Sequence, residues 1–106
     1  MKAKRISIMT YEGDRWQGHL VQRKLLEMLQ QHGVTVASAV PGIAGCARSM
    51  GLTTRSLVAA GGRLPVVVEF VATQEELDLL LPVIRPMVGS RPITTAEIEI
   101  ESAVNV

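Results

Sequence analysis

The segment LPVVVEFV, residues 64–71, has the strongest strand pattern in the chain. Valine dominates it, and only Glu69 interrupts an apolar character that extends to both faces. Successive strand residues point to opposite faces of a sheet, so a segment that is apolar throughout is typical of a central strand covered on both sides. We therefore predict a sheet with residues 64–71 in its interior.

Three further segments have the patterns of strands. Residues 4–11 alternate between two faces, and residues 34–40 form a run rich in β-branched side chains. Residues 93–100 end in an alternation of isoleucine with glutamate, which is typical of a strand. Together with residues 64–71, they predict a four-stranded sheet.

Two segments have the periodicity of amphipathic helices. The first covers residues 15–32, with Asp14 as its predicted N-cap and Gly33 as its C-cap. The second begins at a capping box, in which Thr73 and Glu76 have the required spacing of three residues. This second helix contains two prolines, Pro82 and Pro86. Because proline removes a helical hydrogen bond, we expect that helix to be kinked or shortened.

The predicted order of elements is β-α-β-β-α-β, which is the ferredoxin-like arrangement. We predict one α+β domain over residues 1–106, with an antiparallel four-stranded sheet and two helices on one face. Residues 41–64 then form a long loop between the second and third strands. A connection of this length is either disordered or functional. We expect its tip, residues 50–61, to be mobile without a ligand.

The overall composition excludes several classes of protein. The net charge of +1 provides no global attraction to nucleic acid, and Tyr11 and Phe70 are too few rings for the base-stacking surface of ferredoxin-like RNA binders. The single cysteine, Cys46, excludes an internal disulfide and fits a reducing compartment. No apolar run approaches the ~20 residues of a membrane span. We expect a cytoplasmic protein with no direct membrane insertion and no nucleic-acid partner.

The long loop is the strongest candidate for the functional segment. Residues 34–68 contain no aspartate or glutamate, and the cations among them are Arg48, Arg55 and Arg63. Backbone N–H groups near Gly42 and Gly45 can turn toward an anion, as in loops that bind phosphate. Arg48 and Arg63 can donate bidentate hydrogen bonds to a phosphate. The sequence therefore predicts an anionic ligand or partner.

A second small-residue turn with a cation strengthens this prediction. It consists of Gly89, Ser90 and Arg91, and it follows the second predicted helix. We expect the turn and the loop to lie apart within one subunit. In a ring of subunits, they would face each other across an interface and form a pocket for negative charge.

Other chemistries have weaker support in the sequence. Cys46 beside Arg48 has the setting of an activated thiol, but neither His19 nor His32 can be assigned to it as a base. Glu12 and Asp14 can ligate a cation or act as acid and base, although a turn followed by a helix cap explains them more simply. We predict no metal site and no enzymatic activity.

The chain resembles the PII-like signalling proteins, and in particular a small branch of that family that is often encoded beside ion transporters. The resemblance covers residues 6–101 and is carried by these segments: YEGD at 11–14 with Trp16 and Gly18, HGV at 32–34, GIAG at 42–45, LPVVVE at 64–69, Leu81-Pro82, Ile93-Thr94 and EIE at 97–99.

The resemblance implies a homotrimer that binds adenine nucleotides in clefts between subunits. Gly42 and Gly45 would correspond to the base of the family's mobile T-loop, and the turn at 89–91 to its phosphate-binding turn. The loop would dock on a regulated partner, a membrane transporter for an ion or an inorganic nutrient such as bicarbonate. We assign three residues to that docking surface: Met50, Thr53 and Arg55.

The chain also departs from the better-known PII proteins. Its phosphate-binding turn is shorter, and acidic Glu97, Glu99 and Glu101 stand near the C-terminus in place of basic residues. Fewer cations favour AMP, ADP, cyclic AMP or a small anion over ATP. Two alternatives stay open: an interaction protein without a ligand, and a divalent-cation-binding trimer of the divalent-tolerance type.

Overall fold

A computed structural model describes residues 1–48, 50–55 and 63–101 of the 106-residue chain. The elements run in this order: β1 (Lys2–Tyr11), β2 (Arg15–Trp16), β3 (His19–Leu20), α1 (Val21–Gln31), β4 (Val36–Pro41), β5 (Ala44–Ala47), β6 (Gly51–Thr54), β7 (Pro65–Ala72), α3 (Gln74–Val88) and β8 (Ile93–Glu99).

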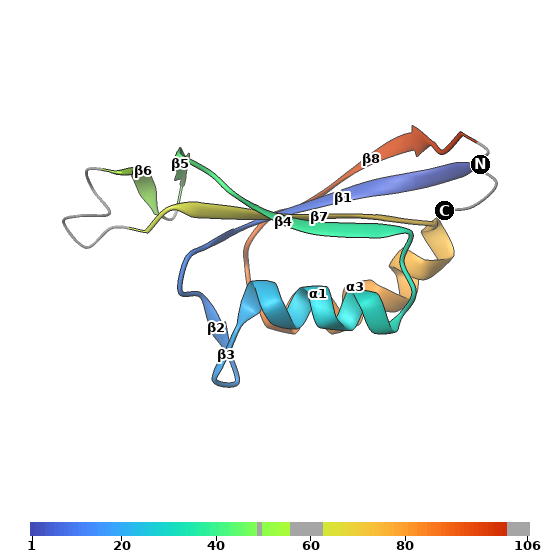
Figure 1. The fold of residues 1–106 in the computed structure, drawn as a ribbon, viewed down its shortest axis with the longest axis horizontal. Coiled ribbons are helices and arrows are strands. Elements are labelled where there is room, and N and C mark those ends of the chain that lie inside the picture. The colour runs from blue at the N-terminus through green and yellow to red at the C-terminus, as the bar shows by residue number, and fades with distance from the viewer. Residues whose placement is uncertain (49, 56–62, 102–106) are drawn as a thin grey trace.

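The main sheet has four antiparallel strands in the order β4-β7-β1-β8. Strand β7 therefore lies in the interior, as its sequence predicts, and the register pairs Ile6 with Phe70 and Ile8 with Val68. Both helices lie on one face of the sheet (Figure 1). This arrangement confirms the predicted ferredoxin-like α+β fold.

The core lies between that face and the two helices. Ile6, Ile8, Val68 and Phe70 of the two central strands are almost fully buried against the apolar side chains of the helices. The prediction that both faces of β7 are covered is wrong for the single chain. On the face away from the helices its side chains are half-buried, and Val36 and Val40 of the neighbouring edge strand are 56% and 54% exposed.

The first helix begins six residues later than predicted. Residues 15–20 form the hairpin β2–β3, whose turn places Gln17 and Gly18 at positive φ, and α1 starts at Val21. Leu20 occupies the N-cap position, and no side chain caps the helix there. The prediction that Asp14 is the N-cap is therefore wrong.

The second helix begins as predicted, because Thr73 and Glu76 form the complete capping box. It continues through Pro82 and Pro86 to Val88, so the expectation of a shortened helix is wrong. No helix among residues 1–48, 50–55 and 63–101 is long and apolar enough to cross a membrane.

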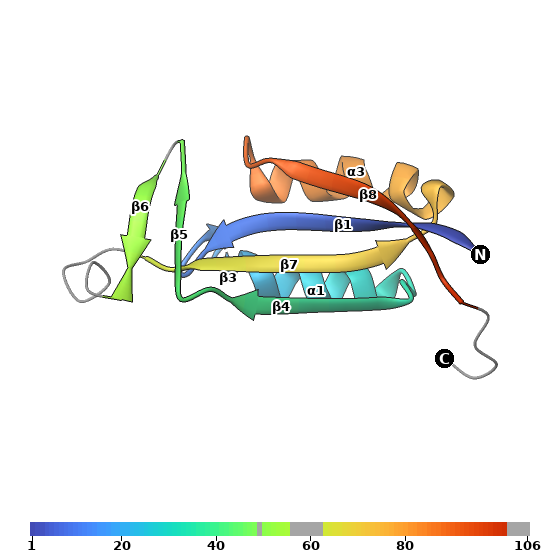
Figure 2. The ribbon, with the colours of Figure 1, turned by 90° about the horizontal axis from the view of Figure 1, so that it is seen from above.

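The described part of the segment between β4 and β7 contains two strands that the sequence did not predict. Its first part forms the hairpin β5–β6, with Cys46 paired to Leu52. The hairpin lies beyond one end of the main sheet, and the N-terminus lies at the opposite end (Figures 1 and 2). Residues 51–54 are thus strand, whereas residues 56–61 of the predicted mobile tip lie outside the described residues.

Candidate functional site

A cleft of about 940 Å³ opens where the hairpin meets the end of β1 and the connection from α3 to β8. We call it the arginine cleft. Its described lining consists of Met9, Tyr11, Cys46, Ala47, Arg48, Met50, Val88, Gly89, Ser90, Arg91 and Pro92. None of these residues is acidic, and the two arginines place cationic groups in the wall of the cleft.

The cleft brings together four of the residues that we predicted to bind an anion, namely Arg48, Gly89, Ser90 and Arg91. They come from two turns that are about forty residues apart in the sequence, and both turns belong to the same chain. The expectation that these groups lie apart within one subunit is therefore wrong. The β5–β6 hairpin lies beyond the end of the sheet (Figure 2). Arg48, which follows β5, lines the same cleft as the turn after α3.

Arg91 is held by two neighbours on the β1 side of the cleft. Its Nη2 atom lies 2.7 Å from Oδ2 of Asp14, and its guanidinium carbon lies 5.0 Å from the centre of the Tyr11 ring. The ion pair and the cation–π contact restrict a long, flexible side chain. Because a guanidinium carries five N–H donors, Arg91 retains donors for a ligand.

Asp14 also binds Arg63, the first described residue after the unassigned part of the loop. Its Oδ1 atom lies 2.9 Å from Nη1 of Arg63, while Oδ2 accepts a hydrogen bond from the backbone N–H of Tyr11 at 3.0 Å. Only 13% of the Asp14 side chain is exposed, against 39% for Arg63. One carboxylate thus links Arg91 of the cleft to the C-terminal end of the long loop. We call this end, residues 63–64, the loop root.

Glu12 strengthens the same junction. Its carboxylate Oε1 accepts a hydrogen bond from the N–H of Leu64 at 3.1 Å, and the N–H of Glu12 donates to the carbonyl of Leu64 at 2.9 Å. Arg63 adds a hydrogen bond to the carbonyl of Glu12 at 3.1 Å. These contacts give the YEGD segment a structural explanation, since three of its four residues fasten the loop root or the cleft arginine.

The turn at residues 89–91 is fixed by Arg85. Its Nη1 atom donates to the carbonyls of Gly89 and Arg91 at 3.0 and 2.9 Å. Gly89 has φ +61° and ψ −130°, a conformation that other L-residues rarely adopt. The cleft wall is therefore a rigid turn that requires glycine at this position.

Gly42 and Gly45 lie outside the described lining of the arginine cleft. A Cβ atom at Gly42 would lie 2.9 Å from Cγ of Pro65, and one at Gly45 would lie 2.8 Å from the same atom. The N–H of Gly42 donates to the carbonyl of Pro65 at 2.8 Å. Both glycines thus allow the hairpin to pack closely on the start of β7, and Arg63 likewise faces Asp14 instead of the cleft.

The predicted docking residues have different surroundings. Met50 lines the arginine cleft, and Arg55 is exposed. Thr53 is only 6% exposed, and its hydroxyl donates to the carbonyl of Gly45 at 3.3 Å, so it supports the hairpin. The apolar side chains that the hairpin region does present to solvent are Ile43, which is 74% exposed, and Leu52, which is 63% exposed.

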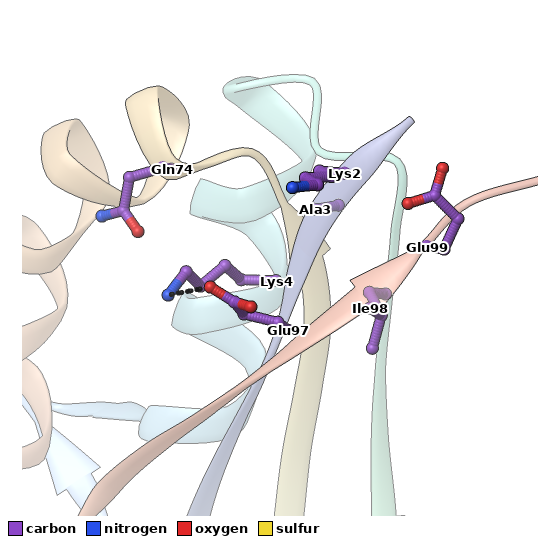
Figure 3. Close-up of a pocket in the computed structure, with 7 residues that line it drawn as sticks. All are labelled: Lys2, Ala3, Lys4, Gln74, Glu97, Ile98 and Glu99. Atoms are coloured by element: carbon purple, nitrogen blue, oxygen red, sulfur yellow. Dashed lines mark ion pairs between the residues drawn. The ribbon is translucent and has the colours of Figure 1, made fainter.

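A second cavity, of about 480 Å³, lies at the opposite end of the sheet (Figure 3). Its lining includes Lys2 and Lys4, together with Glu97 and Glu99. The figure shows Lys4 and Glu97 directed at each other, and their charged atoms lie 4.0 Å apart. Because the charges of this cavity offset each other, it is less suited to an anion than the arginine cleft.

The geometry of the described residues gives little support to a metal site or to a catalytic thiol. Both carboxylate oxygens of Asp14 contact arginines, and the described residues contain no group of three or more metal-ligating side chains. The exposed thiol of Cys46 lies in the arginine cleft, whose described lining contains no histidine to act as its base.

Sequence reasoning missed Tyr11 and the true role of Asp14. Both belong to the YEGD segment that carries the family resemblance, so the signal was present. It could not be interpreted, because the partners of Asp14 are 49 and 77 residues away in the sequence.

Comparison with known proteins identifies a family and a relative of this chain. The family model DUF190, described as "Uncharacterized ACR, COG1993", matches residues 3–100. The UPF0166 protein MJ1524 of Methanocaldococcus jannaschii is 29% identical over 82 residues, which are 77% of this chain and 75% of that protein.

Solved structures of CPII, a nitrogen regulatory PII-like protein from Thiomonas intermedia K12, have the same fold. The form bound to ADP, AMP and bicarbonate has a TM-score of 0.71 and 14% identity, covering 96% of this chain and 91% of that one. The form bound to ADP and bicarbonate has a TM-score of 0.69, with the same identity and coverage.

Proposed function

Because this chain belongs to the DUF190 family and has the fold of PII-like proteins, we propose that it is a non-enzymatic PII-like regulator. Its ligand is an adenine nucleotide or a small oxyanion, bound in the arginine cleft. The observation that carries the proposal is the convergence of Arg48 and Arg91 on a cleft whose described lining has no acidic residue.

The chemistry of the cleft suits a nucleotide. Arg48 and Arg91 supply charge-assisted donors for phosphate, and Met9, Val88 and Pro92 supply apolar surface for a purine. The volume of about 940 Å³ falls within the range of small-molecule sites. ADP and AMP are the ligands that we favour, since two arginines match one or two phosphates better than three. The bound CPII structures support this choice by fold alone.

The shared carboxylate of Asp14 provides a route from the ligand to the loop. The carboxylate of Asp14 contacts both Arg91 and Arg63. An anion that draws Arg91 into the cleft weakens one of these two contacts and leaves the carboxylate to Arg63. Ligand binding therefore fastens the root of the loop, and the loop senses the ligand because the two states differ in this interaction.

The loop acts on a partner protein. Ile43 and Leu52 are exposed apolar side chains and Arg55 is an exposed cation, and such groups in and beside a protruding hairpin suit protein docking. We propose a membrane transporter for an ion or an inorganic nutrient as the partner, by analogy with the PII-like proteins that the sequence resembles.

We propose a homotrimer as the working assembly. The open face of the sheet supports self-association, because Val36 and Val40 are more than half exposed there beside half-buried side chains of β7. Covering this face would also complete the environment that the apolar sequence of β7 predicts.

Native mass spectrometry tests the assembly and the ligand together. We expect a mass three times the 11.5 kDa of one chain, and additional species with up to three bound ADP or AMP molecules. A spectrum without nucleotide adducts for AMP, ADP, cyclic AMP and ATP would favour an interaction protein without a ligand. Adducts of divalent cations alone would favour the cation-binding alternative. A mass of one subunit would remove the trimer from the proposal.

A further inference from the structure

The ring of Tyr11 supports Arg91, but the hydroxyl group of Tyr11 is left unexplained by the proposed function. Tyr11 is the last residue of β1, it is 0% exposed, and it lines the arginine cleft below the guanidinium of Arg91. Its hydroxyl oxygen is buried and has no hydrogen-bond partner among the described residues.

The other polar groups around the end of β1 are paired. The N–H of Tyr11 donates to Asp14, and its carbonyl accepts from the side chain of Gln22 at 3.0 Å. The buried hydroxyl of Thr10 donates to the carbonyl of Val66 at 2.7 Å and accepts from Gln22 at 2.7 Å. Among the buried side-chain nitrogen and oxygen atoms of the described residues, the Tyr11 hydroxyl is the one without a hydrogen-bond partner.

A buried hydroxyl without a partner destabilises the protein, because it has given up its hydrogen bonds to water. Packing does not require the oxygen, since phenylalanine would keep both the ring and its contact with Arg91. The oxygen therefore has a use other than packing, and the ring that carries it lines a cleft with two arginines, which indicates a ligand. Because the hydroxyl itself is buried, the side chains that cover it, among them Arg91 over the ring, must shift before a ligand can reach it.

We infer that the Tyr11 hydroxyl binds the ligand of the arginine cleft, donating a hydrogen bond to an oxyanion oxygen that Arg91 also contacts. This inference rests on the proposed function and adds a specificity-determining residue to it. A neutral donor beside a guanidinium suits an oxygen of a phosphoryl group or of a free oxyanion such as bicarbonate, since such groups accept several hydrogen bonds at once.

The test is Tyr11→Phe, which removes one oxygen and nothing else. Calorimetric titrations with ADP and, separately, with bicarbonate measure affinity, and thermal unfolding of the ligand-free protein measures stability. We expect the variant to bind about tenfold more weakly or worse. We also expect it to unfold at the same or a higher temperature, because the unpaired oxygen is gone. A loss confined to ADP identifies the phosphoryl group as the acceptor, and a loss confined to bicarbonate identifies the free anion.

Thr94→Val is the matched control, because it removes an exposed hydroxyl on β8 that donates to the carbonyl of Ser7 at 3.3 Å, and it should leave both affinities unchanged. Wild-type affinity in Tyr11→Phe for both ligands would overturn the inference and leave the proposed function standing. A fall of several degrees in the melting temperature of the ligand-free variant would also overturn it, since the hydroxyl would then have a structural partner. Failure of the wild-type protein to bind either ligand would overturn the proposed function and the inference together.

Discussion

Replacing Asp14 with asparagine is expected to lower the free energy of unfolding by about 2–3 kcal/mol. The substitution keeps the size of the side chain but removes the charge that two arginines share at 2.9 and 2.7 Å. It also places an amide N–H₂ against a guanidinium, where both groups are donors. The expected loss is below that of a fully buried ion pair, because Arg63 is 39% exposed and partly solvated. Chemical denaturation measures the change.

Asp78→Asn is the matched control for that measurement. Asp78 is exposed on α3 and accepts a hydrogen bond from Gln74 at 2.8 Å, so its loss should change stability by no more than about 0.5 kcal/mol. If Asp14→Asn were as stable as the wild-type protein, Asp14 would not be the link between Arg91 and the loop root. The proposed route from ligand to loop would then be lost.

Replacing Arg91 with alanine is expected to weaken ADP binding about 5- to 150-fold, which corresponds to about 1–3 kcal/mol. Arg91 is the cleft cation with a restricted geometry, since Asp14 and the Tyr11 ring hold it in place. Alanine removes the charge-assisted hydrogen bonds that this side chain donates to a phosphate in the proposed complex. Arg91→Lys should recover only part of the loss, because lysine lacks the bidentate donor geometry. Calorimetry on the three proteins measures these differences.

Arg23→Ala provides the comparison, because it removes the same charge from a side chain that is 80% exposed on α1. Its affinity for ADP should equal that of the wild-type protein. Equal affinities for Arg91→Ala and Arg23→Ala would exclude Arg91 from the site. Because Arg91→Ala also leaves Asp14 with one partner fewer, its ligand-free stability must be recorded beside its affinity.

The main elements of the fold could be predicted because their signals are local. The alternation in residues 4–11, the apolar run at 64–71 and the capping box at Thr73 each specify an element without reference to the rest of the chain. The order of these elements then leaves the ferredoxin-like arrangement as the natural topology.

The predictions of secondary structure failed at two segments where tertiary contacts override local preference. Asp14 has the residue type of a helix cap, but its carboxylate is taken by two distant arginines and the chain makes a hairpin before α1 begins. The segment from 41 to 64 has the composition of a loop, yet Gly42 and Gly45 permit close packing on Pro65, and a second hairpin forms there. Neither distant contact can be read from neighbouring residues.

Only part of the candidate site could be predicted, because its composition is a local signal and its contacts are not. The arginine and glycine content of two turns indicated an anion, and Arg48 and Arg91 do line one cleft. Tyr11 was not predicted, because an unpaired buried hydroxyl is visible only when every neighbour has been placed.

The most direct test of the central claim is a crystal structure of the protein grown with ADP and bicarbonate. The proposal predicts oxyanion density in the arginine cleft, within hydrogen-bond distance of the Arg91 guanidinium and the Tyr11 hydroxyl. ADP bound elsewhere, with only solvent between Arg48 and Arg91, would contradict it.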